Sequence, residues 1–213
     1  MPQVAKRLIQ TYSQKGDVVC DIFCGSGTAL VESRLSGRNS VGIDLNPFAV
    51  FLAKAKTTEV DPSKLTKSFF LLLDRFDNIK SNEIIKPNFL NIDFWFKEKV
   101  ICQLAKLKKA ILEIKDMSIR NFFLVGFSET VRLCSNTKSD EFKLVRKTPE
   151  KLNNFDPDVL GVFKKKTEFN IGAMSGYYYH VDKTISCKVL LGDSSKDNGI
   201  AAKSVDCIIT SPP

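Results

Sequence analysis

Residues 18–28 of this chain read VVCDIFCGSGT, and the expected architecture follows from them. The apolar residues 18–20 predict a short buried strand that ends at Asp21. A glycine turn follows, and apolar-periodic residues from Thr28 onward predict a helix that stops at Gly37. Glycines let the backbone approach a ligand closely, and a helix N-terminus presents free N–H groups. The pattern indicates the entry to a nucleotide site, although on the glycines alone a plain tight turn is the alternative.

Two departures from common nucleotide motifs narrow the kind of cofactor. Leu30 stands where a dinucleotide fingerprint has its third glycine. No Gly-Lys-Ser or Gly-Lys-Thr occurs, which excludes the phosphate-cradling loop of nucleoside triphosphatases. Asp21 at the strand tip would repel a pyrophosphate, whereas it suits a cofactor that carries an ammonium and a sulfonium.

The same residues resemble motif I of the DNA amino-methyltransferases, which use S-adenosyl-L-methionine. The chain matches that motif at seven positions and departs at Ile22, where the family usually has proline. The matching positions are Asp21, Phe23, Cys24, Gly25, Ser26, Gly27 and Thr28. The resemblance implies a Rossmann-like fold and, Cys24 aside, places the cofactor against these residues.

Two later strand ends extend the resemblance. Residues 40–44 predict a second buried strand ending at Asp44, which is placed to accept hydrogen bonds from ribose hydroxyls, and Leu45 follows it. The alternative is a surface aspartate that caps the next helix. Residues 186–191 predict a third strand before Asp193 and Ser194, which resemble motif III and would receive the adenine amine. A plain strand-end turn is the alternative there.

A fourth buried strand is predicted at 205–209, and Thr210, Ser211, Pro212 and Pro213 follow it. This ending resembles motif IV, the catalytic loop of amino methyltransferases, whose serine form is associated with N4 of cytosine. The resemblance implies that Ser211 and the Pro212 carbonyl accept the hydrogens of an exocyclic amine, with Pro212 and Pro213 stiffening the loop. The target base must leave the DNA duplex to reach them. No Pro-Cys occurs, which argues against methylation at ring carbon.

Three other functions stay open at this point: an N6-adenine enzyme, an RNA amino methyltransferase, and a non-catalytic protein that holds cofactor or DNA. The family has an aromatic residue after the second proline, and this sequence stops before it. We therefore expect a chain truncated or split after motif IV, inactive alone and completed by a complementary C-terminal polypeptide. A restriction endonuclease is a further expected partner.

Composition limits the remaining choices. The 213 residues are 43% hydrophobic and 26% charged, which is ordinary for a globular protein. The net charge of +8 favours a polyanionic partner, here duplex DNA. None of the six cysteines forms Cys-x-x-Cys, and His180 is the one histidine, so reduced cysteines, no metal and a cytoplasmic location are expected. No run long enough to span a membrane is present.

The stretch 60–186 carries no nucleotide motif and is too long for a loop, so it predicts an insert with its own structure. Helical spacing occurs at 65–76 and 97–115, and Ser118 is the expected N-cap of a third helix whose phenylalanines are expected in the core. Basic residues there are the candidates for DNA contacts. They are Lys143, Arg146, Lys147, Lys151, Lys164, Lys165 and Lys166.

The predicted fold is α/β, a partial doubly wound parallel sheet of strand order 3-2-1-4. Residues 1–59 and 187–213 are expected to form the S-adenosylmethionine-binding core. Residues 60–186 are expected to form a largely helical insert between strands two and three, with a role in target recognition.

Overall fold

The computed structural model describes residues 2–138 and 143–211, and the chain divides into two compact units. Unit 1 comprises Met1–Glu59 and Met174–Pro213, and unit 2 comprises Val60–Ala173. The first boundary lies between Glu59 and Val60, and the second lies inside helix α9 (Val159–His180).

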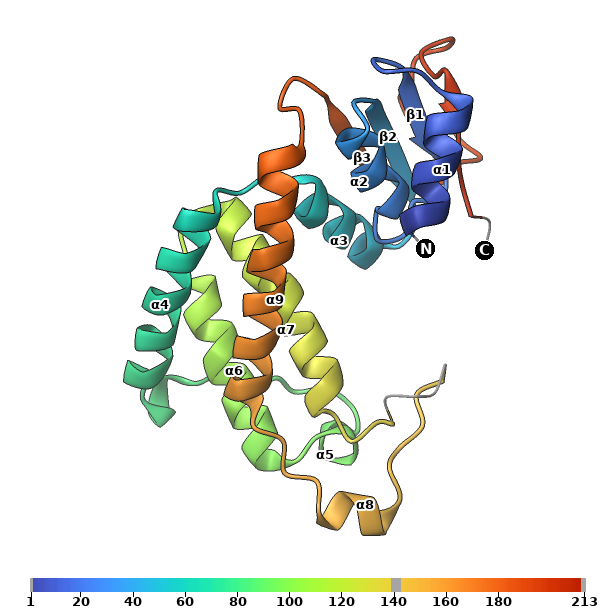
Figure 1. Cartoon of the computed structure of the whole chain (residues 1–213). Coiled ribbons are helices and arrows are strands. Elements are labelled where there is room, and N and C mark those ends of the chain that lie inside the picture. The colour runs from blue at the N-terminus through green and yellow to red at the C-terminus, as the bar shows by residue number, and fades with distance from the viewer. Residues whose placement is uncertain (1, 139–142, 212–213) are drawn as a thin grey trace. The chain divides into compact units, whose positions relative to one another are not determined.

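Unit 1 contains a parallel sheet of four strands, β1 (Val18–Asp21), β2 (Asn39–Asp44), β3 (Cys187–Leu191) and β4 (Cys207–Ile208) (Figure 1). Their order is β3-β2-β1-β4, which confirms the predicted 3-2-1-4 arrangement. In this register Cys20 lies opposite Val41 on one side and Ile208 on the other. All four strands therefore point the same way, and their carboxyl ends meet at one edge of the sheet.

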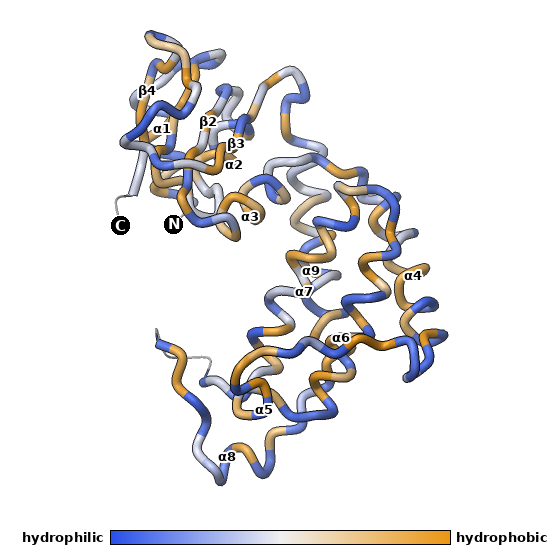
Figure 2. Tube along the Cα trace, turned by 180° about the vertical axis from the view of Figure 1, so that it is seen from behind, coloured by the Kyte–Doolittle hydropathy of each residue, from blue (hydrophilic) through white to orange (hydrophobic). Residues whose placement is uncertain are grey.

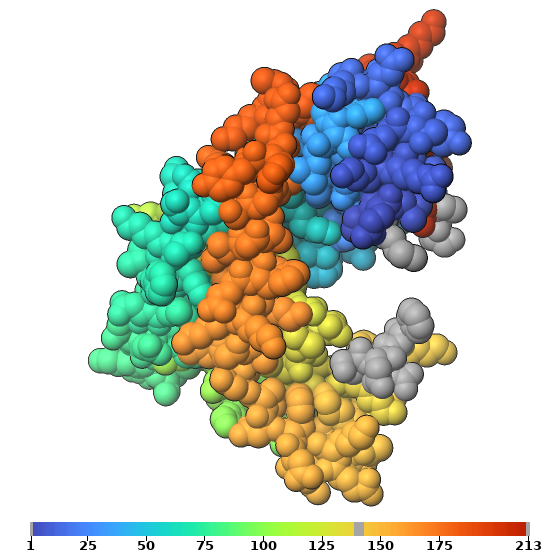
Figure 3. All heavy atoms as spheres, viewed as in Figure 1, coloured from blue at the N-terminus to red at the C-terminus, as the bar shows by residue number. Residues whose placement is uncertain are grey.

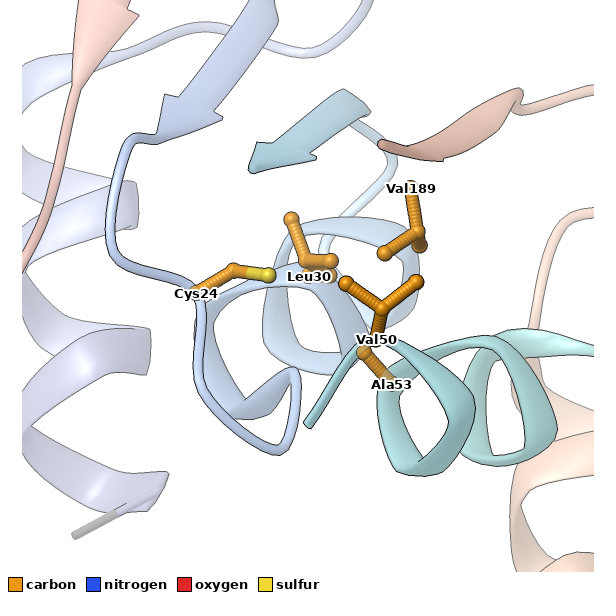
Figure 4. Packing of buried hydrophobic residues seen from close by; sticks show 5 residues of the cluster. All are labelled: Cys24, Leu30, Val50, Ala53 and Val189. Carbon is orange, nitrogen blue, oxygen red and sulfur yellow. The ribbon is translucent and has the colours of Figure 1, made fainter. Parts of the chain in front are cut away.

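Three helices belong to the amino-terminal part of unit 1: α1 (Pro2–Tyr12), α2 (Thr28–Leu35) and α3 (Pro47–Thr57). A buried cluster joins α2 and α3 to the sheet, as Figure 4 shows; its members are Cys24, Leu30, Val50, Ala53 and Val189. Gly42 of β2 lies beneath this cluster. A Cβ on Gly42 would lie 2.5 Å from Leu30 Cδ1 and 3.0 Å from Cys24 Sγ, so the close packing of α2 on the sheet requires glycine there.

A buried arginine ties the far ends of unit 1 together. Arg34 of α2 is 5% exposed, and its Nη1 donates to the Thr57 carbonyl at 2.6 Å and to the Tyr177 hydroxyl at 2.9 Å. The same nitrogen pairs with Glu59 Oε2 at 2.7 Å, and Nη2 donates to the Ile185 carbonyl at 2.9 Å. One side chain thus fixes the end of α3, the last turns of α9 and the approach to β3.

Unit 2 is helical, as predicted for the insert. Its longer helices are α4 (Pro62–Asn78), α6 (Glu98–Leu112), α7 (Met117–Cys134) and the first part of α9. The shorter elements are a 3-10 helix (Ser81–Glu83), α5 (Ile92–Trp95) and α8 (Pro149–Asn153). Hydrophobic and hydrophilic residues alternate along these helices, as expected for elements that bury one face (Figure 2).

Phe122 and Phe123 of α7 lie in the core of unit 2, as expected for the phenylalanines of this helix. Phe123 is fully buried and stacks on Phe69 with ring centroids 6.2 Å apart, and Phe163 meets Phe69 edge-on at 6.3 Å. The expected N-cap of α7 was wrong by two residues. Asp116, not Ser118, caps the helix by accepting from the Ser118 and Ile119 amides.

Helix α9 was not predicted as an element. Its sequence lacks a clear helical pattern of apolar residues, because polar and apolar residues are mixed around much of the helix. Phe163 and Thr167 are nevertheless buried, whereas Lys165 and Phe169 are exposed. Figure 3 shows one side of this helix, in orange, open at the surface.

No helix in residues 2–138 and 143–211 has the length and apolar character needed to cross a membrane. All six cysteines are free thiols; Cys20, Cys24 and Cys134 are buried, and the other three are half-buried.

Gly42→Ala should lower the free energy of unfolding by about 1–3 kcal/mol, because the added methyl group overpacks the contact with Leu30 and Cys24. Urea denaturation would measure the change. Gly176→Ala is the control: this helical glycine has open space around it, so alanine should raise stability by about 0.5–1 kcal/mol. A Gly42→Ala protein as stable as the parent would contradict the packing argument.

Candidate functional site

A cavity of about 420 Å³ opens at the carboxyl ends of β1 and β4. Its walls come from three places in the chain: the stretch from the end of β1 to the start of α2, the amino-terminal part of α1, and the segment after β4. The lining residues from the last segment are Ile209, Thr210 and Ser211. The cavity therefore brings the region of the glycine turn and the segment after β4 together, although 180 positions of the sequence separate Ala29 from Ile209.

The centre of this site is Asp21, which is 6% exposed. Its Oδ1 accepts from the Phe23 amide at 3.2 Å and from the Thr210 hydroxyl at 2.7 Å. Burial raises the pKa of this carboxyl above its ordinary range, against the lowering effect of the two donors. Burial therefore makes the charged form of Asp21 unfavourable, and a positively charged ligand would offset this loss of solvation.

Asp44 connects the turns after β1 and β2. Its Oδ2 accepts from the Gly25 amide at 2.8 Å, and its Oδ1 accepts from the Asn46 amide at 2.8 Å. Its backbone carbonyl also receives the Gly192 amide at 3.0 Å. The carboxylate keeps unused lone pairs, so these contacts leave capacity for a ligand hydroxyl. The Asn46 side chain, rather than Asp44, caps α3 by accepting from the Phe48 amide at 2.9 Å.

The glycine turn brings α2 to the cavity with its first amides open. Gly27 occupies the left-handed region at φ 80° and makes no side-chain cap, and Thr28 and Ala29 line the cavity. A Cβ on Gly27 would lie 2.9 Å from Ala53 Cβ, so α3 also requires glycine here. Lys56 of α3 donates from Nζ to the Ser26 carbonyl at 2.9 Å and to its hydroxyl at 3.1 Å, which fixes the turn from outside.

Several residues that line this cavity are not among the site residues predicted from the sequence, although the amphipathic spacing of residues 3–14 did predict the helix that carries three of them. Val4, Ala5 and Leu8 of α1 line the cavity, and Val4 is 55% exposed despite its place on the apolar stripe. Their amphipathic spacing was a usable signal. The role of Thr210 in holding Asp21 had no signal, because it depends on the pairing of β4 with β1.

The other predicted cofactor residues lie at the strand ends outside the cavity lining. Leu45 is 72% exposed after β2, and Ser194 is half-buried after β3. Asp193 Oδ1 accepts from the Ser195 amide at 3.0 Å and from its hydroxyl at 2.7 Å, the turn geometry that was the alternative reading. These bonds lower the pKa of Asp193. Pro212 and Pro213 lie outside the described residues.

The basic candidates for DNA contacts all lie in unit 2 and differ in their surroundings. Lys143, Arg146 and Lys151 are exposed. Lys147 is half-buried and donates to the Ser135 carbonyl at 2.8 Å and to the Thr137 carbonyl, and burial lowers its pKa.

The lysine run of α9 does not form one surface. Lys164, Lys165 and Lys166 are consecutive on a helix and so point in different directions, about 100° apart. Lys165 is exposed, whereas Lys166 lies 3.5 Å from Glu129 Oε1.

Parallel strands in the order β3-β2-β1-β4, a glycine turn after β1 and acidic residues at the ends of β1, β2 and β3 define a Rossmann-like methyltransferase fold. The comparison with known families agrees: residues 2–55 match the family model described as DNA methylase. No solved structure matches the chain significantly.

Curated relatives extend the match beyond the first motifs. The type II methyltransferase M.MvaI of Kocuria varians is 37% identical over 235 residues, which cover 100% of this chain and 50% of that protein. M.MjaII of Methanocaldococcus jannaschii is 38% identical over 80 residues, 38% of this chain and 14% of that protein. M.BamHI of Bacillus amyloliquefaciens is 33% identical over 92 residues, 43% of this chain and 22% of that protein.

These matches confirm the resemblance drawn from the motifs: the chain is related to the DNA amino-methyltransferases. The chain spans about half the length of M.MvaI and a smaller part of the other two.

Asp21→Asn should stabilise the protein at neutral pH. The amide oxygen can accept from Phe23 and Thr210 as the carboxylate does, without the cost of a buried charge. Because the folded-state pKa of Asp21 is raised, its favourable contribution is complete below the ordinary aspartate pKa of about 3.9 and is lost as pH rises through the folded value. The advantage of the variant in urea denaturation should therefore grow with pH.

Asp193→Asn provides a control of opposite sign. The folded-state pKa of Asp193 is lowered, so its contribution is present above the ordinary pKa and is lost as pH falls through the folded value. This variant should be less stable than the parent at neutral pH, with a gap that closes on acidification. An Asp21→Asn gap that shrinks as pH rises would contradict the assigned burial effect.

Proposed function

We propose that this chain provides the cofactor-binding core of a DNA methyltransferase that uses S-adenosyl-L-methionine and modifies N4 of cytosine. The observation that carries the proposal is the cavity in which the buried Asp21 and the exposed Ser211 share one lining. A site for a cationic methyl donor and a site for an amine acceptor must adjoin for methyl transfer, because the reaction is a direct displacement.

The residues present fit the cofactor. Asp21 is a buried carboxylate beside the cavity, where an ammonium or sulfonium would offset its desolvation. The amide end of α2 and the Gly25 turn allow close backbone approach, and Asp44 holds that turn while keeping lone pairs for ribose hydroxyls. Asp193 and Ser194, after β3, are proposed to contact the adenine. When bound, S-adenosylmethionine supplies a methyl group activated by its sulfonium.

The residues after β4 are proposed to act on the exocyclic amine of the target base, which accepts the methyl group. We assign Ser211 the role of accepting a hydrogen from the exocyclic amine, so that the nitrogen lone pair is localised for attack. The serine at this position is what favours cytosine N4 over adenine N6. Thr210 fixes the start of this segment through its bond to Asp21, so donor and acceptor sites are held by one hydrogen bond. Burial raises the pKa of Cys24 to about 12, so this thiol of the cavity wall stays protonated and is a poor nucleophile.

Duplex DNA is the proposed substrate, and unit 2 its proposed recognition region. The net charge of +8 supports a polyanionic partner, and the exposed Lys143, Arg146 and Lys151 support contacts from unit 2. A complementary C-terminal polypeptide and a restriction endonuclease stay predictions.

S-adenosylmethionine should bind in preference to NAD in isothermal titration calorimetry. Asp44→Ala should weaken its binding by about 1–3 kcal/mol, because the Gly25 amide and the ribose hydroxyls lose their acceptor. Asp116→Ala is the matched control, since Asp116 also accepts from two backbone amides but lies in unit 2. Its affinity for the cofactor should be unchanged. Equal binding of NAD, or equal loss in both variants, would refute the cofactor assignment.

Incubation of duplex DNA and isotope-labelled S-adenosylmethionine with this chain and a complementary C-terminal polypeptide should yield 4-methylcytosine, measured by mass spectrometry of the digested nucleosides. The chain alone should yield little or no product. Ser211→Ala should reduce the rate by about 100-fold or more, since it removes one preorganised acceptor. Label in 6-methyladenine would replace cytosine by adenine in the proposal, and label in RNA alone would overturn the DNA substrate. Cofactor binding with no labelled product even when the complementary polypeptide is present would favour a non-catalytic binding role, and robust turnover by the chain alone would contradict the expected truncation.

A further inference from the structure

Unit 2 contains a second cavity, of about 600 Å³, which the motifs do not explain. It lies between the α5–α6 region, the segment after α7 and the start of α8. Its lining includes Asp93, Lys97, Glu98, Asn136 and Arg146. The volume falls within the range of about 300–1,000 Å³ that is typical of small-ligand sites.

Asn136 is the most unusual residue of this lining, because it is 3% exposed and incompletely bonded. Its backbone amide donates to the Trp95 carbonyl at 2.8 Å, and its Nδ2 donates to the Phe94 carbonyl at 3.1 Å. Its Oδ1 has no hydrogen-bond partner in the part of the chain that the structure describes. If the side-chain amide were rotated by 180°, Oδ1 would face the Phe94 carbonyl oxygen, which is unfavourable. The bond from Nδ2 to Phe94 therefore identifies Oδ1 as the atom without a partner. A buried acceptor of this kind favours a ligand that donates a hydrogen bond.

Arg146 contributes a planar cation at the rim. Its guanidinium carbon lies 4.2 Å from the centroid of the Phe94 ring, and an antiparallel bridge with Thr137 sets its position. The next residue, Lys147, is turned toward the Ser135 and Thr137 carbonyls. Arg146 is exposed and so remains accessible to a ligand, which its plane can stack upon or donate to.

The charges around the cavity favour a nucleobase over a phosphate. Lys97 and Arg146 supply donors, Asp93 supplies an acceptor, and Glu98 is engaged by an ion pair with Lys86. A phosphate offers only acceptors, so it cannot satisfy Asn136 and would be repelled by Asp93. A base that carries an exocyclic amine offers a donor, ring acceptors and a flat face.

We propose that this cavity binds one nucleobase of the DNA, with Asn136 Oδ1 accepting from the exocyclic amine and Arg146 contacting the base from the rim. The assignment rests on the proposed function, because it takes DNA as the substrate. It adds a base-reading site in unit 2, separate from the methyl-transfer site of unit 1.

The chain carries its own reporter for this cavity. Trp95 is the one tryptophan of the sequence, and its carbonyl accepts the Asn136 amide. The centroids of the Trp95 and Phe94 rings are 4.8 Å apart in an edge-on arrangement, and the guanidinium of Arg146 lies over the Phe94 ring. Occupancy of the cavity should therefore change tryptophan fluorescence, whereas no tryptophan lines the cavity of unit 1.

The test is a fluorescence titration of the full chain with single-stranded oligo-dC, oligo-dA and oligo-dT of equal length. Oligo-dC and oligo-dA should give a saturable change, and oligo-dT should bind about tenfold more weakly, because thymine lacks an exocyclic amine. Fluorescence anisotropy of end-labelled oligonucleotides measures total DNA binding in the same samples. Calorimetry with S-adenosylmethionine measures unit 1 independently.

Three variants assign the effect. Arg146→Ala, an exposed change that should not affect folding, is expected to weaken the tryptophan response to all three oligonucleotides about tenfold. Asn136→Ala should remove the difference between oligo-dC and oligo-dT, with circular dichroism to verify its fold. Lys143→Ala is the control, because Lys143 is exposed but does not line the cavity; it should keep the tryptophan response.

The possible failures are distinguishable. DNA binding in anisotropy without a tryptophan response, or an equal response to oligo-dT and oligo-dC, would overturn the base-binding cavity and leave the proposed function intact. Loss of the oligo-dC response in Lys143→Ala equal to that in Arg146→Ala would also overturn it. Cofactor binding without any DNA binding would instead refute DNA as the substrate, and the cavity assignment with it.

Discussion

The carboxylate of Asp44 makes the contacts on which the geometry of the proposed methyl-donor site depends. One of its oxygens holds the Gly25 amide and the other holds the Asn46 amide, while its carbonyl receives Gly192. Three loops that begin at different strands are thereby fixed to one residue. This is possible because parallel strands end at the same edge, so that residues far apart in sequence become neighbours. The close approach of α2, which Gly42 permits, then places the helix amides beside the same edge.

Asp21 adds an electrostatic constraint to this frame. A buried carboxylate with a raised pKa is unfavourable for the folded chain, and the Thr210 hydroxyl only partly offsets that cost. Residues that destabilise the free protein in this way are common where a ligand of opposite charge binds. The same hydrogen bond joins the segment that precedes Ser211 to the strand that carries the glycine turn. Cofactor binding and acceptor positioning are therefore coupled through Asp21 in our proposal.

The local sequence pattern was sufficient to predict the strands of the sheet and the acidic residues at or just after their ends. A short apolar run that ends at an acidic residue and a turn is most simply interpreted as a buried strand. The glycine turn after the first strand then indicated where the next helix begins. Strand order followed from the resemblance. Local pattern could not supply the tertiary features: the bond from Thr210 to Asp21, and helix α9, whose buried Phe163 and Thr167 lie among polar neighbours. The lysines of α9 also show the limit of prediction from local sequence, because consecutive residues of a helix point in different directions and do not form one basic surface.

The cavity of unit 2 illustrates the same limit more strongly. Asn136 and Arg146 lie within a segment that reads as a polar, basic loop, for which phosphate contact is the simplest interpretation. Folding separates their roles: Lys147 is used to bind carbonyls, Arg146 is stacked on Phe94, and Asn136 is buried with one acceptor unsatisfied. An unsatisfied buried acceptor lowers stability, so its presence beside a cavity needs a physical reason, such as a donor that arrives with a ligand. Basic charge alone would bring DNA to this surface without distinguishing its sequence, whereas a buried amide oxygen can distinguish bases that carry an amine from those that do not.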